Sequence, residues 1–325
     1  MNPFTFFISE FIRLTNIKQS NLNAKWLITI VSLFFLWKLL SRDFFIFSDV
    51  PYWALERVPF YTYNPEQAFF IFDLLYVTKL VTFHWIHEFI PFPSSETLQF
   101  IKYICILSFI CIIFFGRGPK RIFVVTSYLT FAYLWGYIFR SGQEIDAVFL
   151  PMGILFCYLF STFKESWSKE NLSKYSQSSS IFIFSSLMIF VIYYAGSGIN
   201  KLTDIPLNEW FLYDLMGQVE QAVVADKLGA DRAVPGFFSW MLGLNRVILS
   251  NLFYVGVGVV YFVHLLSPLI ILRSHFLIIP FVFYFVFHFL AFGVGISFTA
   301  NLLVWIGFVN IKNIQEGKLP YYGYR

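Results

Sequence analysis

The sequence has little charge. Asp, Glu, Lys and Arg make up 13% of its 325 residues, whereas an ordinary soluble domain contains about 25%. Cysteine is scarce too: Cys105, Cys111 and Cys157 lie in apolar stretches, without metal-ligand spacing and without polar neighbours that would stabilise a thiolate. We interpret them as small buried apolar residues, which excludes thiolate chemistry and a cysteine-bound metal.

Other absences exclude further classes of protein. The chain has no phosphate-binding glycine loop and no nucleophile elbow, and Gly136 and Gly142 lack the spacing of a dinucleotide-binding turn. No pattern indicates a nucleic-acid partner, and we attribute the net charge of +4 to anchoring at an inner membrane face. Residues 1–25 are polar and amphipathic, and no cleavage site follows the first apolar run, so no cleavable signal peptide is expected.

Apolar side chains are what the sequence has in excess. Hydrophobic residues make up 58% of the chain and aromatic residues 22%, with 44 phenylalanines and a mean hydropathy of +0.67. Such a chain would aggregate in water but suits an apolar solvent, so we predict a polytopic membrane protein in contact with the lipid bilayer. The richness in Phe, Ile, Lys and Asn suits a bacterial source.

Apolar runs can be compared with the roughly 20 residues of a membrane-crossing helix. Eight runs are clear candidates for such a helix. A ninth, Phe69–Ile90, is weaker because five charged or histidine residues interrupt it. Gly293 and Gly295 separate the last two of the clear candidates. The clear candidates are Trp26–Leu40, Leu98–Phe115, Ile122–Phe139, Ala147–Phe163, Ile181–Ile199, Leu252–Leu272, Phe276–Phe292 and Ile296–Val309.

The distribution of basic residues favours eight crossings, with both termini in the cytoplasm. If Phe69–Ile90 did cross, giving nine, the basic residues near the N-terminus would face away from the later basic clusters. We therefore interpret Phe69–Ile90 as an interfacial or re-entrant helix. With eight crossings, thirteen of the 23 basic residues face the cytoplasm: Arg13, Lys18, Lys25, Arg117, Lys120, Arg121, Lys164, Lys169, Lys174, Arg273, Lys312, Lys318 and Arg325.

The predicted architecture is an all-α, single-domain bundle of about eight, or nine, transmembrane helices over residues 1–325. Residues 1–25 form a cytoplasmic segment, residues 26–311 the bundle, and residues 312–325 a cytoplasmic tail. The two long outer segments, 42–95 and 202–250, are rich in aromatic residues or amphipathic, and we expect them to form an outward-facing helical cap. The cap would be either an entrance for a substrate arriving from the lipid or a plug.

One motif carries most of the functional argument. The apolar run that ends near Ile199 continues as Tyr-Ala-Gly-Ser-Gly-Ile-Asn-Lys-Leu over residues 194–202, followed by Asp204 and Trp210. It places Lys201 at the mouth of an apolar helix, as either an interface anchor or a buried amine. A second motif, Phe-His-Phe over residues 287–289, places His288 within another apolar run.

These two motifs, with the order of the helices and the two outer segments, resemble the HTTM family, which shares its transmembrane domain with the vitamin K-dependent gamma-carboxylases. The resemblance covers nearly the whole chain. It implies that Lys201 is the base that deprotonates a vitamin K hydroquinone-like reduced quinone. It also implies that His288 helps to bind or polarise the substrate. A lysine base at neutral pH needs its pKa lowered from about 10.4, which desolvation at a membrane cavity would achieve.

Three residues are candidates for substrate binding: Asp146, Tyr194 and Trp210. Simpler interpretations stand beside the functional ones. Lys201 could extend its charge to the membrane surface, His288 could bond a backbone carbonyl within the core, and Asp146 could lie in a solvated turn at a helix start. His84, His87 and Glu88 have metal-compatible spacing but lie where polar residues mark a water-facing side, so no metal is assigned.

Two departures distinguish this chain from the carboxylases. The segment 140–149 falls where the carboxylases carry another catalytic histidine, and here the nearest polar candidate is Asp146. The large outer domain of the carboxylases is also missing, so we expect no peptidyl-glutamate carboxylase. Whether catalysis is retained stays open. The first hypothesis is base chemistry on a quinol or other lipid-soluble substrate at an outward-facing cavity of the bacterial inner membrane. The alternative is a non-catalytic accessory protein that matures or exports a partner peptide, and a transporter ranks third because no internal repeat is evident.

Overall fold

The computed structural model describes residues 5, 8, 9, 12, 13, 16, 18–41, 95–115, 120–140, 145–161, 167–204, 265, 266, 303, 304 and 306–318. At 95, 120, 135–140, 145–149 and 196–204 it describes the backbone alone. Among the described residues the long elements are all helical: α2 (Asn21–Ser41), α5 (Ser95–Phe115), α6 (Lys120–Arg140), α7 (Ile145–Phe160) and α9 (Gln177–Asp204). They coincide with the first five predicted apolar runs, so the prediction of a mainly helical chain is confirmed.

Three of these helices are long and apolar enough to cross a membrane: Asn21–Ser41, Glu96–Phe115 and Gln177–Ala195. Arg121–Leu134 and Leu150–Phe160 are shorter apolar helices. Three predicted runs lie wholly or almost wholly outside the described residues: Phe69–Ile90, Leu252–Leu272 and Phe276–Phe292. Of Ile296–Val309, the structure describes 303, 304 and 306–309, mostly as helix. The outer segments 42–95 and 202–250 are likewise almost entirely outside, so the total of eight or nine crossings and the helical cap stay predictions.

Two helices extend beyond the apolar runs that predict them. α2 begins at Asn21 rather than at Trp26, because the side chains of Asn21 and Asn23 are buried and hydrogen-bonded rather than left in water. α9 runs from Gln177 to Asp204 rather than ending at Ile199. The motif with Gly196 and Gly198 therefore lies within the helix.

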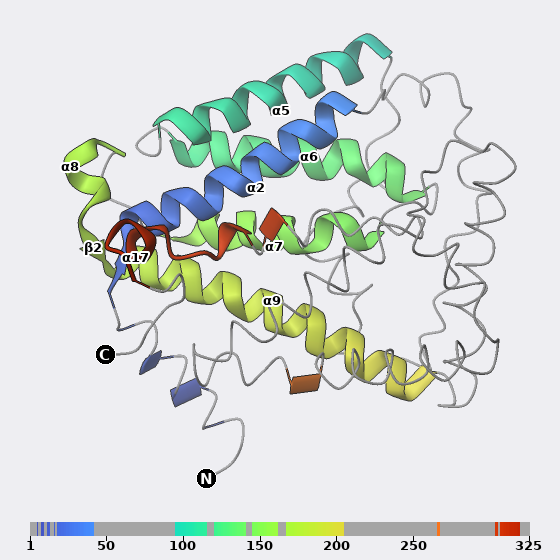
Figure 1. Cartoon of the computed structure of the whole chain (residues 1–325). Helices are drawn as coiled ribbons and strands as arrows, with labels where there is room; N and C mark the ends of the chain where they lie inside the picture. Colours follow the sequence, from blue (N-terminus) through green and yellow to red (C-terminus); the bar gives the residue numbers. More distant parts are fainter. Residues whose placement is uncertain are drawn as a thin grey trace, which may run out of the picture.

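A short antiparallel strand pair, not predicted from the sequence, joins the starts of α2 and α9. β1 (Gln19–Ser20) pairs with β2 (Tyr175–Ser176), with Gln19 opposite Ser176 and Ser20 opposite Tyr175. The short helices α8 (Lys169–Leu172) and α17 (Ile311–Gln315) lie at this same end of the bundle (Figure 1). We call it the β end, and the opposite end, where α2 and α9 finish, the far end.

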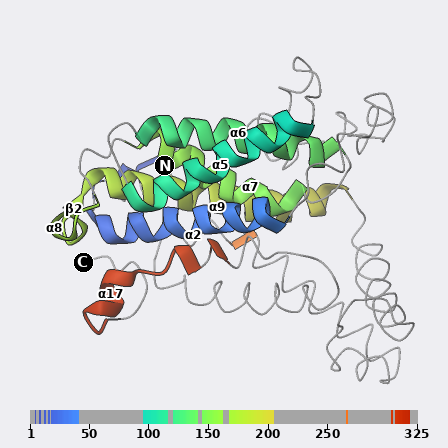
Figure 2. The same cartoon turned by 90° about the horizontal axis from the view of Figure 1, so that it is seen from above.

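The helices alternate in direction between the two ends. α2 and α9 both start at the β end, and Figure 1 shows them diverging towards the far end with α7 between them. α7 finishes near the start of α9, since the rings of Tyr158 and Phe182 lie 5.1 Å apart. Short connections at 116–119 and 141–144 make α5, α6 and α7 antiparallel neighbours, and Figure 2 shows α5 and α6 side by side. α5 and α7 therefore start at the far end.

Aromatic rings fill the space between α2, α5 and α6. The ring of Phe35 lies 4.9 Å from that of Phe109 and 4.4 Å from that of Phe131. The outward surface of α5 is apolar as well, because large side chains at helical spacing are exposed there. An apolar exterior of this extent would be a liability in water and is what lipid contact requires. The exposed side chains on α5 are Phe100, Tyr103, Leu107, Ile110, Phe114 and Phe115.

Polar side chains tie the β end together. Oδ1 of Asn21 accepts hydrogen bonds from the hydroxyls of Ser176 at 2.6 Å and Ser179 at 2.7 Å, and the backbone N–H of Gln19 donates to Ser180 Oγ at 2.8 Å. These bonds join the segment before α2 to the start of α9. Satisfied buried polar groups of this kind fix one arrangement of the chain, because an unsatisfied group would be costly.

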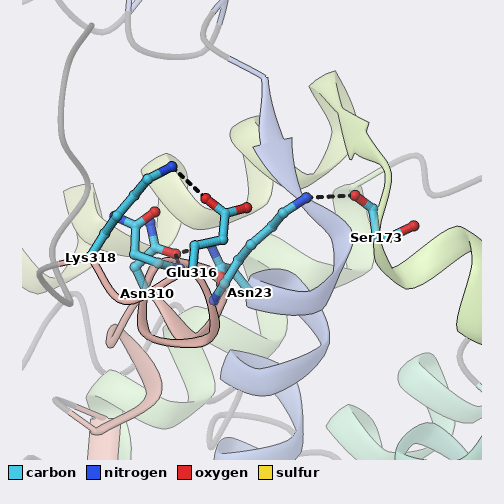
Figure 3. A network of polar contacts seen from close by, with 7 residues as sticks. Asn23, Ser173, Asn310, Glu316 and Lys318 are labelled. Atoms are coloured by element: carbon cyan, nitrogen blue, oxygen red, sulfur yellow. Dashed lines mark hydrogen bonds and ion pairs between the residues drawn. The ribbon is translucent and has the colours of Figure 1, made fainter.

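The segment 303–318 is bound to the same end (Figure 3). Nδ2 of Asn23 donates to Oδ1 of Asn310 at 2.9 Å, and Nε1 of Trp26 donates to the carbonyl of Ile306 at 2.8 Å. Nζ of Lys312 donates to the carbonyl of Ser173 at 2.8 Å. At the exposed end of this segment the Lys318 ammonium bonds Glu316 and lowers the pKa of that carboxyl from its ordinary value.

Candidate functional site at the far end of the bundle

Tyr194 is the one predicted site residue whose side chain the structure describes. It is 1% exposed, and its ring centroid lies 4.4 Å from that of Phe190 and 5.0 Å from that of Tyr193. Phe190 in turn lies 5.9 Å from Phe308, so this face of α9 packs against the segment that follows residue 303. Tyr194 therefore belongs to the apolar interior of the bundle.

Lys201 lies on the same helix as Tyr194, in its last turn. α9 is continuous from Gln177 to Asp204, so its backbone fixes the register of position 201. Seven residues are two helical turns, which puts positions 194 and 201 on the same face, about 10 Å apart along the axis. Because this face is buried at Tyr194, position 201 continues a face that points to protein rather than to lipid at that level.

Asp146 lies in the first turn of α7, at the far end. Contacts between α7 and α9 set their relative height: an ideal Cβ built on Gly153 would lie 2.5 Å from Cγ2 of Ile189, and Tyr158 contacts Phe182. The two helices are antiparallel, and each rises about 1.5 Å per residue, so these contacts put position 146 level with positions 194–196 of α9. The backbone thus brings the predicted positions 146 and 194 to the same height on packed helices.

The other predicted site residues lie outside the described part of the chain. Trp210 and His288 stay predictions, as does the cluster of His84, His87 and Glu88. Within the described ranges, no group of three or more His, Cys, Asp and Glu side chains is placed to hold a metal ion.

A residue that the sequence reasoning missed is Lys38 on α2. It lies near the far end, is 4% exposed, and is the one charged side chain among those that are buried in the described residues. Its Nζ lies 5.1 Å from the ring centroid of Trp37 and 5.9 Å from that of Phe34. The sequence feature that could have identified Lys38 is its place within the apolar run Trp26–Leu40, because an ionisable residue inside such a run is a candidate functional residue.

Four positions on three helices therefore lie towards the far end: Lys38 on α2, Asp146 on α7, and Tyr194 and Lys201 on α9. Comparison of the chain with models of known families, with curated proteins and with solved structures finds no match.

Proposed function

We propose that this chain is an HTTM-like integral membrane protein that uses Lys201 for base chemistry on a quinol or another lipid-soluble substrate. The observation that carries the proposal is the register of α9. The membrane-length helix α9 continues without a break through position 201. That position lies on the same face of the helix as the buried Tyr194. In this proposal the bundle shelters Lys201 from water, as a base of this kind needs.

The chemistry asked of Lys201 is a single proton transfer. The neutral amine takes the proton of a substrate hydroxyl and becomes an ammonium, leaving an oxyanion beside it. A reduced quinone, as the family resemblance implies, would supply such a hydroxyl on an apolar ring. In this proposal His288 helps to bind or polarise the substrate, and Asp146, Tyr194 and Trp210 contact it.

An even number of crossings is part of the proposal. The start of α2 and the helix α17 lie at the same end. α2 finishes at the far end, where α5 starts, and this supports the proposal that Phe69–Ile90 is interfacial or re-entrant. α9 finishes at the far end while α17 lies at the β end, which calls for an odd number of crossings between them. Three apolar runs are predicted in that stretch. Together with the five long helices described above, they bring the proposed number of crossings to eight.

The proposed orientation places the β end in the cytoplasm and the far-end site outward, in a bacterial inner membrane. Basic side chains outnumber acidic ones at the β end among the described residues, and cytoplasmic loops carry such an excess. Both chain ends then face the cytoplasm. The basic residues concerned are Lys18, Lys25, Arg121, Lys169, Lys174, Lys312 and Lys318, against Glu170 and Glu316.

The experiment that tests the base is a comparison of Lys201→Arg and Lys201→Met, each at wild-type expression, for rescue of a cell that lacks the gene. We expect both to fail, because arginine keeps the charge but does not deprotonate at neutral pH and methionine keeps the length only. Lys174→Arg, an exposed lysine at the β end, is the matched control and should rescue fully. Full rescue by Lys201→Arg would refute base chemistry and favour the accessory-protein alternative.

A further inference from the structure

Two basic side chains at the β end are unpaired among the described residues. Within that part of the chain, the ammonium of Lys25 on α2 and the guanidinium of Arg121 on α6 make no hydrogen bond and no ion pair. Lys174 at the same end differs, because its Nζ donates a hydrogen bond to Oδ1 of Asn171 at 2.8 Å. The N–H donors of Lys25 and Arg121 are therefore open to an anion from outside the chain.

Lys25 and Arg121 lie at about the same depth in the bundle. α2 and α6 both start at the β end, and the rings of Phe35 on α2 and Phe131 on α6 lie 4.4 Å apart. Each basic residue precedes the ring on its own helix by ten positions, which is about 15 Å along the axis. The two charges therefore lie near one plane, close to the starts of the two helices.

This plane is where the exposed apolar surface of α2 and α6 begins. Trp26 follows Lys25, and tryptophan is enriched at the level of lipid headgroups. From the two charges towards the far end, each helix exposes an apolar strip of the kind that lipid acyl chains cover. The strip on α6 consists of Ile122, Val125 and Leu129, the strip on α2 consists of Leu33 and Trp37, and these side chains are 37% to 62% exposed.

We propose that Lys25 and Arg121 bind the headgroups of anionic phospholipids, whose acyl chains lie along the apolar strips of α2 and α6. Phosphodiester oxygens accept charge-assisted hydrogen bonds from a guanidinium or an ammonium, and basic residues near a membrane surface attract anionic lipids. The strips favour a lipid over a soluble anion, which has no apolar part to cover them. The inference needs the bundle to lie in a membrane. It does not need base chemistry, because Lys201 lies at the opposite end.

The test measures lipid binding to the purified full-length protein by native mass spectrometry. Dioleoyl phosphatidylglycerol, which is anionic, is compared with dioleoyl phosphatidylcholine, which has the same acyl chains and no net charge. We expect the wild type to bind the first phosphatidylglycerol at least about fivefold more tightly, the ratio that one basic residue near an anionic headgroup provides. Glycerol 3-phosphate should not displace it. Displacement would indicate a site for a soluble phosphate and overturn the assignment to lipid.

Variants assign the preference to the two residues. The double variant Lys25→Gln/Arg121→Gln should bind both lipids equally, and its retained phosphatidylcholine binding shows that it folds. Lys25→Arg/Arg121→Lys keeps both charges and should keep the preference.

Lys174→Gln/Lys318→Gln is the matched control, because it removes two charges from exposed positions at the same end, and it should also keep the preference. The inference is wrong if the wild type binds both lipids equally or if Lys25→Gln/Arg121→Gln retains the preference. It is also wrong if the control loses the preference as fully, since net charge alone would then explain it. Lys201→Met should leave the preference unchanged, so this inference and the base hypothesis fail separately.

Discussion

Nδ2 of Asn23 donates a hydrogen bond to Oδ1 of Asn310 at 2.9 Å, although 287 positions separate the two residues along the chain. Both side chains are buried, and both amides have second partners. Oδ1 of Asn23 accepts from the backbone N–H of Lys312 at 3.1 Å, and Oδ1 of Asn310 accepts from that of Asn313 at 3.0 Å. The amide pair thus caps α17 and fixes it to the start of α2.

The first prediction is that Asn23→Ala and Asn310→Ala each lower the free energy of unfolding by about 1–3 kcal/mol, because each leaves buried polar partners without a hydrogen bond. The double variant should lose less than the sum of the two, since the bond is lost only once. Denaturant unfolding in detergent micelles measures this, with Gln177→Ala at an exposed position as control. Additive losses would show that the two amides do not depend on each other.

A second prediction concerns the close approach of α7 and α9 at Gly153. An added Cβ would lie 2.5 Å from Cγ2 of Ile189, a distance at which the Ile189 side chain or one of the two helices has to move. Gly153→Ala should therefore destabilise the bundle by about 1–3 kcal/mol, the usual range for overpacking.

Ile189→Leu removes the obstructing Cγ2 and should recover part of that loss when it is combined with Gly153→Ala. Thermal unfolding of the single and double variants in the same detergent measures the recovery. A double variant that is less stable than Gly153→Ala would place the obstruction elsewhere.

The third prediction concerns the sides of the membrane on which the helix ends lie. In a chain whose three cysteines are replaced by alanine, Ser173→Cys and Lys318→Cys should react with a membrane-impermeant thiol reagent from the same side. Glu96→Cys, at the start of α5, should react from the other side. All three positions are exposed in the folded chain.

Labelling of intact cells and of inverted vesicles distinguishes the two sides. Reaction of Ser173→Cys and Lys318→Cys from opposite sides would contradict the contact between α17 and the β end. Reaction of Glu96→Cys from the same side as the other two would mean that residues 42–94 cross the membrane.

Hydropathy and length were enough to predict α2, α5, α6, α7 and α9, because lipid leaves helices as almost the only way to satisfy the backbone of an apolar run. The ends of these helices were harder to place. Asn21 and Asn23 read as a polar segment before a helix, and only their long-range partners reveal that they are buried within it. The pairing of Gln19 with Ser176 has no sequence signal either, since strands of two residues have no periodicity.

The candidate site was predictable in part for the same reason. The motif around Lys201 stands out by its chemistry, and an apolar run predicts the helix that carries it. Gly196 and Gly198 lie within that run, and the helix continues through them because the loss in helix propensity, about 1 kcal/mol per glycine, is small beside the requirement for backbone hydrogen bonds in lipid. Lys38 went unnoticed since a single lysine in a hydropathy window does not reveal whether it points inward.

The bond between Asn23 and Asn310 also has a consequence for how the protein is made. The start of α2 acquires this partner only after a further 287 residues have been synthesised. At about 5–20 residues per second, synthesis of that stretch takes roughly 15 to 60 s. During this interval the amide of Asn23 lacks the partner that it has in the folded chain, so α2 is fixed to α17 only late in synthesis.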